Sequence, residues 1–421
     1  MILTLYRGLT TLGAPLISYY LRRRLKRGKE DGQRFGERLG QTGQPRPPGR
    51  LVWLHAASVG ESVSMLPVIE RLLQNGALSV LVTTGTVSSA DLMAKRLPVG
   101  ALHQYAPVDR LAWVRRFLDH WKPDLALWAE SEFWPNLVTE AAARNIPMIL
   151  LNGRISDRSF ARWRRQPRLI RKLLSGFVLC LGQTPLDSQR LTALGARQVA
   201  FCGNLKFAAP PLPVDSALLS RLAGQMGDRP RWLAASTHAG EELMAGRLHL
   251  ALAAQYPRLL TIIAPRHPNR ADAVRDQLVG LGLKLARHSD ETADLGQSDV
   301  LLVDTLGELG LFMRLSPIVF MGKSMLGQGG QNPLEPARLG ASVLFGPHME
   351  NFQDIARRME NAGAALRLTD ETALAEALRC RLGDPALVTQ AGDAARAFAT
   401  AEDGVLDCVF DELRPWLSLI G

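Results

Sequence analysis

The chain of 421 residues is 47% hydrophobic and 21% charged, with 37 glycines and 25 prolines. This composition excludes disorder, collagen and coiled coil, and it is typical of a soluble α/β enzyme of two or three domains. Residues 1–50 hold 11 Lys/Arg and 3 Asp/Glu, so +8 of the net charge of +10 lies there. A basic excess confined to one terminal arm argues against nucleic-acid binding by the body of the chain.

The N-terminal arm, residues 1–29, is apolar and ends in a basic cluster. Its 14 uncharged residues from Gly8 to Leu21 are fewer than the roughly 20 that span a bilayer. The basic residues follow the apolar stretch, opposite to their order in a signal peptide. We therefore expect the arm to associate with an anionic membrane surface, with the body in the cytoplasm. The alternative is a first helix packed on the domain with a solvated basic turn.

From Leu51 onward, short apolar runs alternate with amphipathic stretches, the pattern of parallel βαβ units. Strands are predicted at 51–54, 80–83, 125–129, 148–151, 178–181 and 199–201, then at 232–235, 259–264, 300–303, 318–321 and 343–345. A proline-rich segment at 208–214 separates the two series and is predicted to be a linker. The predicted fold is α/β, with Rossmann-like domains at 30–207 and 215–421 facing a central cleft, and a closing helical stretch from about 385 to 417.

Several familiar motifs are absent. The sequence has no GxGxxG after its first strand, no HExxH and no GxSxG, and Pro317 stands where a P-loop ending at Ser324 would need its first glycine. Eight scattered histidines form no metal-ligand pattern, so neither a metal nor a cofactor is predicted. The four cysteines, at 180, 202, 380 and 408, lack metal spacing and are expected to be buried thiols in a reducing compartment.

Three strand-end segments of the first half carry candidate catalytic groups. Glu61 opens a helix after the first strand, where it either points into the cleft or serves only as a local cap. Glu130 and Glu132 follow the strand at 125–129, and residue chemistry does not favour one over the other. Lys206 precedes the linker, where it could reach a bound anion or be solvated.

Two segments of the second half are candidate phosphate-binding loops. Arg266 and His267 lie between two prolines, just after an apolar strand. Their side chains offer hydrogen-bond donors to a phosphate. The glycine-rich loop at 327–336, with Gly329 and Gly330, runs toward a predicted helix, so its backbone N–H groups and the helix dipole could bind phosphate. Glu335 could accept ribose hydroxyl hydrogen bonds. The alternative is a mobile glycine-rich loop.

Five motifs in this order, HAASVGE, AESEFWPN, GNLKF, APRHPN and GGQNPLEP, resemble the 3-deoxy-D-manno-oct-2-ulosonic acid (Kdo) transferases of lipopolysaccharide assembly. The resemblance covers almost the whole chain. It implies a GT-B glycosyltransferase at the cytoplasmic face of the inner membrane of a Gram-negative cell. Such an enzyme moves Kdo from CMP-Kdo to the 6′-hydroxyl of the tetraacylated lipid A precursor, by inverting single displacement. The sequence does not say how many Kdo units are added.

The resemblance also implies residue roles. Glu61 matches the general base, and Glu130 and Lys206 match transition-state stabilisers. The segments that match CMP contacts are Pro265, Arg266, Leu306, Gly307, Glu308, Asn332, Pro333, Leu334 and Glu335, with His267, Gly329 and Gly330 as secondary candidates.

Three other functions compete with this interpretation. A nucleotide-sugar 2-epimerase on the same scaffold would need no membrane arm. A non-catalytic, hinged binding module would not need Glu61 at the cleft. A lipid glycosyltransferase with a UDP-sugar donor differs only in its donor and is the hardest to exclude from residues alone.

Overall fold

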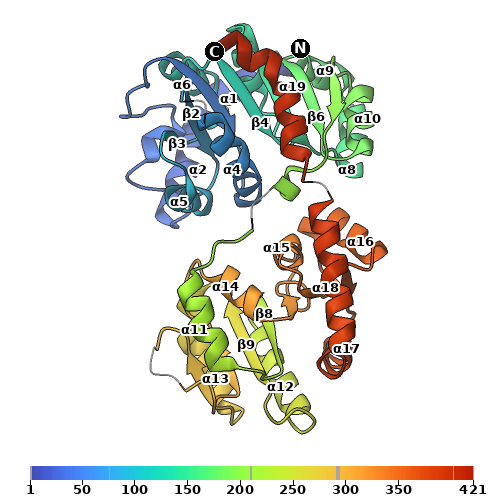
Figure 1. Cartoon of the computed structure of the whole chain (residues 1–421). Helices are drawn as coiled ribbons and strands as arrows, with labels where there is room; N and C mark the ends of the chain where they lie inside the picture. The colour runs from blue at the N-terminus through green and yellow to red at the C-terminus, as the bar shows by residue number, and fades with distance from the viewer. Residues whose placement is uncertain (1, 75, 209–210, 291–293, 402, 421) are drawn as a thin grey trace. The chain divides into compact units, whose positions relative to one another are not determined.

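The computed structural model describes residues 2–74, 76–208, 211–290, 294–401 and 403–420. The chain divides into two compact units, the first made of Met1–Ala209 and Glu402–Gly421 and the second of Pro210–Ala401 (Figure 1). Two residues of the predicted linker, 209 and 210, lie outside the described part. Within the described residues, each unit contains one seven-stranded sheet in which every pair of neighbouring strands is parallel.

The first sheet has the strand order β3-β2-β1-β4-β5-β6-β7, so the order reverses between β1 and β4. Its strands are β1 (Arg50–His55), β2 (Leu78–Thr84), β3 (Ala101–Tyr105), β4 (Leu125–Ala129), β5 (Met148–Gly153), β6 (Phe177–Gly182) and β7 (Val199–Phe201). Its helices are α1 (Ile2–Leu12), α2 (Ala14–Lys26), α3 (Phe35–Arg38), α4 (Val59–Leu73), α5 (Val87–Arg96), α6 (Leu111–Trp121), α7 (Pro135–Ala143), α8 (Asp157–Arg164), α9 (Pro167–Leu174), α10 (Pro185–Leu194), the 3₁₀ helix η1 (Leu205–Ala208) and α19 (Val405–Ile420). The central strands are buried on both faces, which explains their continuous apolar runs.

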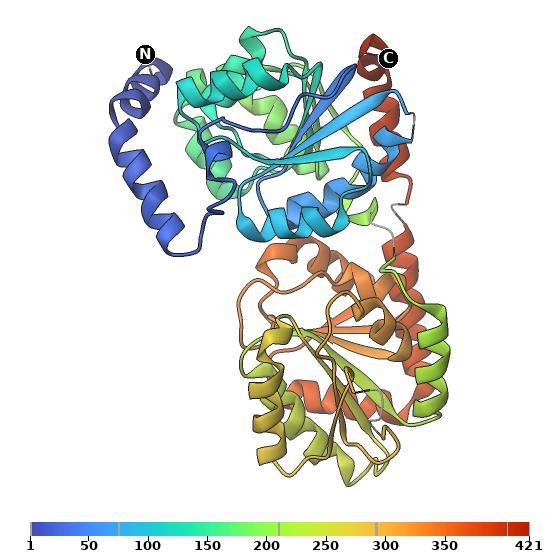
Figure 2. The same cartoon turned by 90° about the vertical axis from the view of Figure 1, so that its left-hand side faces the viewer.

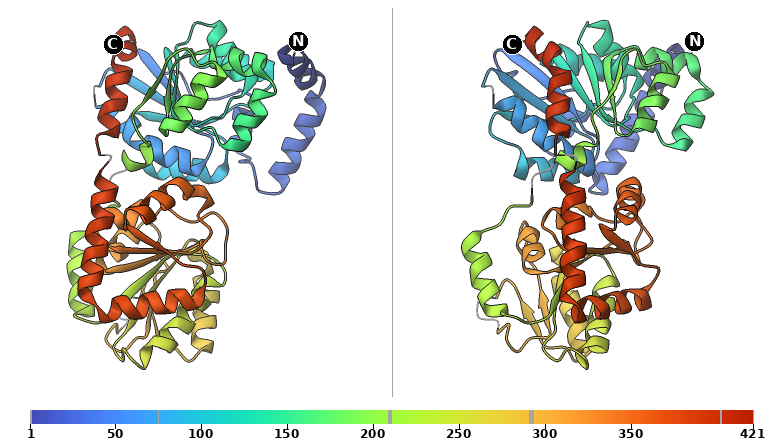
Figure 3. Two further views of the ribbon diagram at one scale, coloured as in Figure 1. Left: turned by 90° about the vertical axis from the view of Figure 1, so that its right-hand side faces the viewer. Right: turned by 45° about the vertical axis from the view of Figure 1, so that its right-hand side comes forward.

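The second sheet has the order β10-β11-β9-β8-β12-β13-β14, with its reversal between β8 and β12. Its strands are β8 (Arg231–Thr237), β9 (Leu260–Pro265), β10 (Leu285–Arg287), β11 (Val300–Leu302), β12 (Ile318–Met321), β13 (Ser342–Phe345) and β14 (Ala365–Arg367). Its helices are α11 (Ser216–Met226), α12 (Glu241–Ala253), η2 (Pro268–Arg270), α13 (Ala271–Gly280), α14 (Leu309–Leu315), α15 (Leu334–Arg338), η3 (Glu350–Phe352), α16 (Gln353–Asn361), α17 (Glu371–Gly383) and α18 (Pro385–Thr400). Helix α18 contacts α15 and β13, and α17 contacts α12 (Figure 3).

The closing helical stretch departs from the prediction. It is two helices rather than one, and the second, α19, belongs to the first unit instead of the second. Val405, Val409 and Leu413 of α19 are buried in the first core together with Met65 and Leu205. The predicted boundary of 215–421 is therefore wrong at its end, because the apolar stripe of α19 covers the first sheet.

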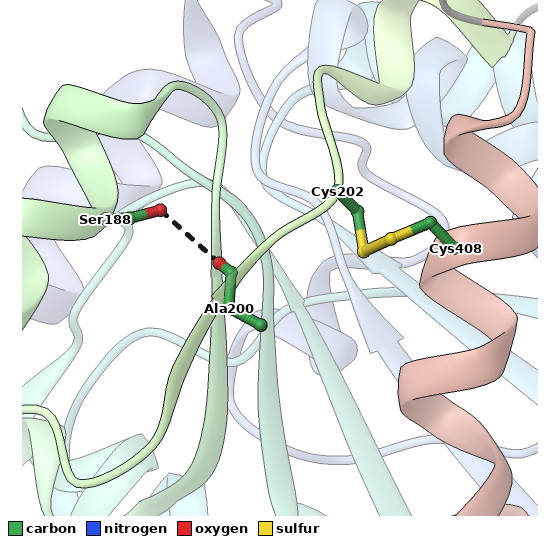
Figure 4. The surroundings of a disulfide bond; sticks show 4 residues. All are labelled: Ser188, Ala200, Cys202 and Cys408. Carbon is green, nitrogen blue, oxygen red and sulfur yellow. Dashed lines mark hydrogen bonds between the residues drawn. A yellow bond between two sulfur atoms is a disulfide. The ribbon is translucent and has the colours of Figure 1, made fainter.

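The cysteines also differ from the expectation of four buried thiols. Cys202, just after β7, and Cys408, on α19, form a disulfide with a Cα–Cα distance of 5.5 Å (Figure 4). Cys180 is buried as a free thiol, whereas Cys380 is exposed. The pairing could not be predicted, because it depends on the return of α19 to the first unit.

The N-terminal arm forms helices α1 and α2 along one side of the first unit (Figure 2). The Tyr6 hydroxyl donates to Asp109 Oδ2 at 2.8 Å, and Arg7 contacts Glu140 at 2.9 Å, so one face of α1 is docked on the domain. The opposite face exposes Leu5, Leu9 and other apolar side chains. In the described part of the chain, no helix has the length and apolar character needed to cross a membrane.

Candidate active site

Glu61 stands in the first turn of α4, at the carboxyl end of β1. Ser58 is the N-cap of this helix and its side chain accepts from the Glu61 backbone N–H, with the Ser-x-x-Glu spacing typical of a capping box. The Ser58 hydroxyl donates to Glu61 Oε1 at 2.7 Å, and the Ala57 backbone N–H donates to Oε2 at 2.7 Å. The carboxylate is thus held in one orientation at the edge of the sheet where the strand order reverses.

The electrostatic surroundings of Glu61 suit a proton acceptor. The residue is only 7% exposed, and burial raises its pKa to about 7, with further rises from the charges of Glu130 and Glu132. The hydrogen bonds from Ser58 and Ala57 act in the opposite direction but are outweighed. A carboxyl group with a pKa near neutrality can take a proton from a substrate and release it again at physiological pH.

Glu130 follows β4, the neighbour of β1, and lies beside Lys206. Its φ of 53° is in the left-handed region, and its backbone N–H donates to Leu151 O at 2.9 Å. This backbone conformation is uncommon for a residue other than glycine and turns the side chain out of the strand direction. Glu130 Oε1 lies 3.7 Å from Lys206 Nζ.

Lys206 belongs to η1, which Asn152 near the end of β5 helps to hold in place. Asn152 Oδ1 accepts from the Leu205 backbone N–H at 3.1 Å, and Asn204 Oδ1 accepts from the Lys206 backbone N–H at 3.0 Å. Three predicted residues from three strand ends are therefore brought into one electrostatic cluster. Glu132 lies nearby, and burial and the charge of Glu130 raise its pKa.

The histidine of the first motif has a structural role. His55 Nδ1 lies 2.9 Å from Thr83 Oγ1, and its ring lies 4.6 Å from that of Trp128. Burial lowers the pKa of His55 to about 3, so the ring is neutral. It supports the end of β1 from which the loop to Glu61 departs.

In the second unit, the segments predicted to bind CMP lie at the carboxyl ends of β9, β11 and β12. The backbone N–H of Arg266 donates to Thr237 O at 3.0 Å, which joins the loop after β9 to the end of β8. The side chains of Arg266 and His267 are exposed, and Pro265 is buried. Leu306 is 66% exposed beside Gly307, and Glu308 Oε2 lies 3.1 Å from His288 Nε2.

The glycine-rich loop differs from the expectation of free backbone N–H groups. The N–H of Gly329 donates to Glu350 Oε2 at 2.6 Å, and that of Gly330 donates to Lys323 O at 3.0 Å. Both glycines have positive φ, and a Cβ at Gly330 would lie 2.3 Å from Met349 Sδ. These glycines permit close packing against the loop after β13, so their N–H groups are not free to bind phosphate.

The helix after this loop, α15, is only five residues long, so the predicted dipole at its start is small. Pro333 is its N-cap and Leu334 is buried. Asn332 Oδ1 accepts from the Leu334 N–H at 3.2 Å, and Asn332 Nδ2 donates to Glu335 Oε1 at 3.4 Å. The polar groups at 332 and 335 are thus brought together.

The segment ending at Ser324, whose sequence resembles the end of a P-loop, binds a buried carboxylate of the protein itself. Glu241, fully buried, accepts hydrogen bonds from the backbone N–H groups of Lys323, Ser324 and Met325 at 2.6–3.1 Å. An anion of the protein itself therefore occupies the amide cluster that a P-loop would offer to phosphate.

Sequence reasoning did not single out two residues near these segments. Ser58 could have been found from its position three residues before Glu61, which is the capping-box spacing. His238 follows β8, and its ring centroid lies 5.7 Å from that of His267, while its Nε2 lies 3.4 Å from Gln331 Nε2. Its position just after the first strand of the second series was the available signal.

Known proteins with similar sequences belong to the family that these motifs resemble. Residues 33–209 match the family model described as 3-deoxy-D-manno-octulosonic-acid transferase (kdotransferase). A 3-deoxy-D-manno-octulosonic acid transferase of Bordetella pertussis is 37% identical over 98% of this chain and 99% of its own. One of Haemophilus influenzae is 31% identical over 98% of both chains.

A solved structure of UDP-GlcNAc 2-epimerase from Neisseria meningitidis matches 87% of this chain and 100% of its own, with a TM-score of 0.59 and 15% identity. At that identity the likeness shows the fold alone, so it gives no support to the epimerase alternative. The two-sheet α/β architecture is that of the GT-B glycosyltransferases, as predicted. The sequence matches extend over the full length of named transferases, and the chain therefore belongs to the 3-deoxy-D-manno-octulosonic acid transferase family and is a glycosyltransferase.

Proposed function

We propose that the enzyme transfers Kdo from CMP-Kdo to the 6′-hydroxyl of the tetraacylated lipid A precursor in lipopolysaccharide synthesis. The observation that carries the catalytic part of this proposal is Glu61, a buried carboxylate with its pKa raised to about 7, beside the Glu130–Lys206 ion pair. A primary hydroxyl has a pKa far above 7, so it needs a positioned base as it attacks. Glu61 supplies that base.

The transfer is a single displacement. The acceptor oxygen bonds to the anomeric carbon of Kdo, the bond from that carbon to the phosphate oxygen of CMP breaks, and Glu61 takes the hydroxyl proton. The configuration at the anomeric carbon is therefore inverted. Lys206, oriented by Glu130, stabilises the negative charge that develops during transfer.

The donor assignment is supported by the polar loops of the second unit. Arg266 and His267 offer exposed donors to the phosphate of CMP, which leaves as a monoester. Glu335 accepts from the ribose hydroxyls, and Leu306 presents an apolar side chain to the pyrimidine. The family names carry the Kdo part of the proposal, and the resemblance of the motifs carries the CMP part.

We place the enzyme at the cytoplasmic face of the inner membrane. The outward side chains of α1 and α2 include Leu5 at 63% exposure, Leu12 at 84% and Tyr19 at 68%. Arg22 and Arg23 follow on α2 and are exposed. Apolar side chains beside basic ones bind an anionic bilayer from its surface, which brings the enzyme to a lipid acceptor.

The test is mass spectrometry of the acceptor lipid after incubation with CMP-Kdo, with wild-type protein and with Glu61→Ala. Wild type should add one or more Kdo masses, and the same spectrum counts the additions. Glu61→Ala should add none while it still binds CMP in calorimetry. Turnover by folded Glu61→Ala would refute the base assignment, and no Kdo addition by folded wild type would refute the donor or the acceptor.

A further inference from the structure

A pocket of about 480 Å³ opens in the first unit between α1 and one face of α6, from Arg110 just before the helix to Asp119 in its last turn. Thr11 of α1 forms one wall, one helical turn after the docked Arg7. Leu111 and Ala112 of α6, with three arginines, form the other. No residue of the proposed catalytic or CMP sites lines it, so the pocket is a separate feature of the domain.

The charge of the pocket is strongly positive. Arg110, Arg115 and Arg116 line it, against one carboxylate, Asp119, which pairs with Arg144 at 2.7 Å. Each guanidinium group carries five N–H donors in a fixed geometry that suits phosphate oxygens, although Arg115 already donates to Glu140 and Arg116 to Leu39 O. The ligand that this lining favours is therefore an anion with several oxygens.

The arginines are held in place with part of their donor capacity unused. The Arg110 guanidinium lies over the Trp113 ring at 5.1 Å, and its buried Nε has no hydrogen-bond partner within the described part of the chain. Arg116 donates from Nη1 to Leu39 O at 3.0 Å. Arg115 contacts Glu140 at 2.8 Å. A docked anion would gain donors that are already oriented.

The start of α6 adds a second source of positive potential. This helix has 11 residues, and its N-cap, Arg110, provides no side-chain cap. The first-turn N–H groups belong to Leu111 and Ala112, which themselves line the pocket. An uncapped helix start beside three guanidinium groups is a suitable site for phosphate.

The surroundings of the pocket indicate where such a phosphate comes from. Leu5, Leu9 and Leu12 lie at helical spacing on α1, with exposures of 63%, 62% and 84%, and Leu16 continues the stripe at 74%. Soluble monomers rarely leave such a stripe in water. The pocket therefore lies beside the surface that would enter the bilayer interface.

We propose that this pocket binds the phosphate of an anionic phospholipid headgroup while α1 and α2 lie on the bilayer. This inference rests on the membrane association proposed above. A bound headgroup fixes how the first unit is oriented on the membrane, because its contacts come from α6 of the domain as well as from the arm.

The test is co-sedimentation of the full chain with vesicles of phosphatidylcholine, alone or with one third phosphatidylglycerol, at fixed ionic strength. The pocket variant is Arg110→Gln/Arg116→Gln. The matched control is Arg162→Gln/Arg168→Gln, which removes the same charge from exposed positions of the same unit outside the pocket. We expect partition onto the anionic vesicles to fall at least about tenfold for the pocket variant and less than about threefold for the control. Equal losses, or no loss, would overturn the proposal.

Two further measurements identify the source of the phosphate. In detergent, the pocket variant should keep its transfer rate and its KM for the acceptor lipid within about twofold; a raised KM would make the pocket an acceptor subsite instead. Calorimetry with inorganic phosphate should show weak binding by wild type. Tight binding of free phosphate together with unchanged vesicle binding by the variant would overturn the lipid assignment. Wild-type inactivity in detergent would refute the proposed function alone.

Folding of the variant needs its own check, because the Arg110 side chain packs on Trp113. Arg115→Gln/Arg116→Gln leaves Arg110 on Trp113 and leaves Glu140 paired with Arg7 and Arg144, and it should show the same selective loss on anionic vesicles. Vesicle binding that this second variant retains in full would overturn the proposal.

Discussion

Replacing Glu61 by glutamine should make the first unit more stable and the enzyme inactive. The folded carboxyl has a pKa of about 7 against an ordinary value of 4.5, so the folded state holds the proton more tightly than the unfolded state. The stability that this provides is fully present below pH 4.5 and is lost as the pH rises through 7. At pH 8, this rise in the pKa of the Glu61 carboxyl on folding lowers the free energy of unfolding by about 3 kcal/mol relative to low pH.

Glutamine mimics the protonated form of Glu61. Its oxygen can accept from the Ala57 N–H, and its amide can donate to the Ser58 hydroxyl. We therefore expect Glu61→Gln and wild type to have similar unfolding free energies near pH 4. At pH 8 the variant should be more stable by about 3 kcal/mol.

The assay is urea unfolding followed by tryptophan fluorescence at pH 4.5 to 8.5. Every tryptophan except Trp232 lies in the first unit, so the signal reports mainly on the unit that contains Glu61. Glu70→Gln, on the exposed side of the same helix, is the control and should change stability by less than about 0.5 kcal/mol at every pH. A stability difference for Glu61→Gln that does not grow between pH 5 and pH 8 would refute the assigned electrostatics.

Three other predictions concern the proposed reaction. Glu132→Gln removes a like charge near Glu61, so the rise of kcat/KM with pH should move to lower pH by less than about one unit; a move to higher pH would contradict the coupling. Arg266→Ala should raise KM for CMP-Kdo about tenfold and KM for the acceptor less than about twofold, and equal rises in steady-state kinetics would count against its role at the phosphate. His238 lies against His267, so His238→Gln should weaken CMP binding about three- to tenfold in calorimetry, and an unchanged Kd would show that His238 does not contribute to the CMP site.

Much of the fold could be predicted because parallel central strands are buried on both faces. The strand at 125–129, for example, begins and ends where β4 does. The strands β3, β10 and β14 were missed. Each lies at the edge of its sheet, and β10 and β14 have only three residues, so none shows a continuous apolar run.

The candidate catalytic residues were found because ligand sites of such sheets follow the carboxyl ends of strands. The contact of Glu130 with Lys206 could not be predicted from the sequence, since the position of Lys206 depends on contacts from Asn152, more than fifty residues away along the chain. The role of Gly329 and Gly330 was misjudged for a related reason. Their N–H partners come from the loop after β13 and from Lys323, which sequence spacing cannot reveal.

The return of α19 gives the chain a closed covalent topology. The second unit, Pro210–Ala401, is an insertion within the first, and the Cys202–Cys408 bond joins the two sides of that insertion across a sequence separation of 206 residues. The cytoplasm keeps thiols reduced, so this bond is a property of the oxidised, purified protein: there, a protease that cuts once inside the second unit would produce two fragments that migrate together on a gel until a reductant is added. The second unit is one continuous segment of the chain, whereas the first consists of two segments, so expressing the first as a single chain requires a new connection between them.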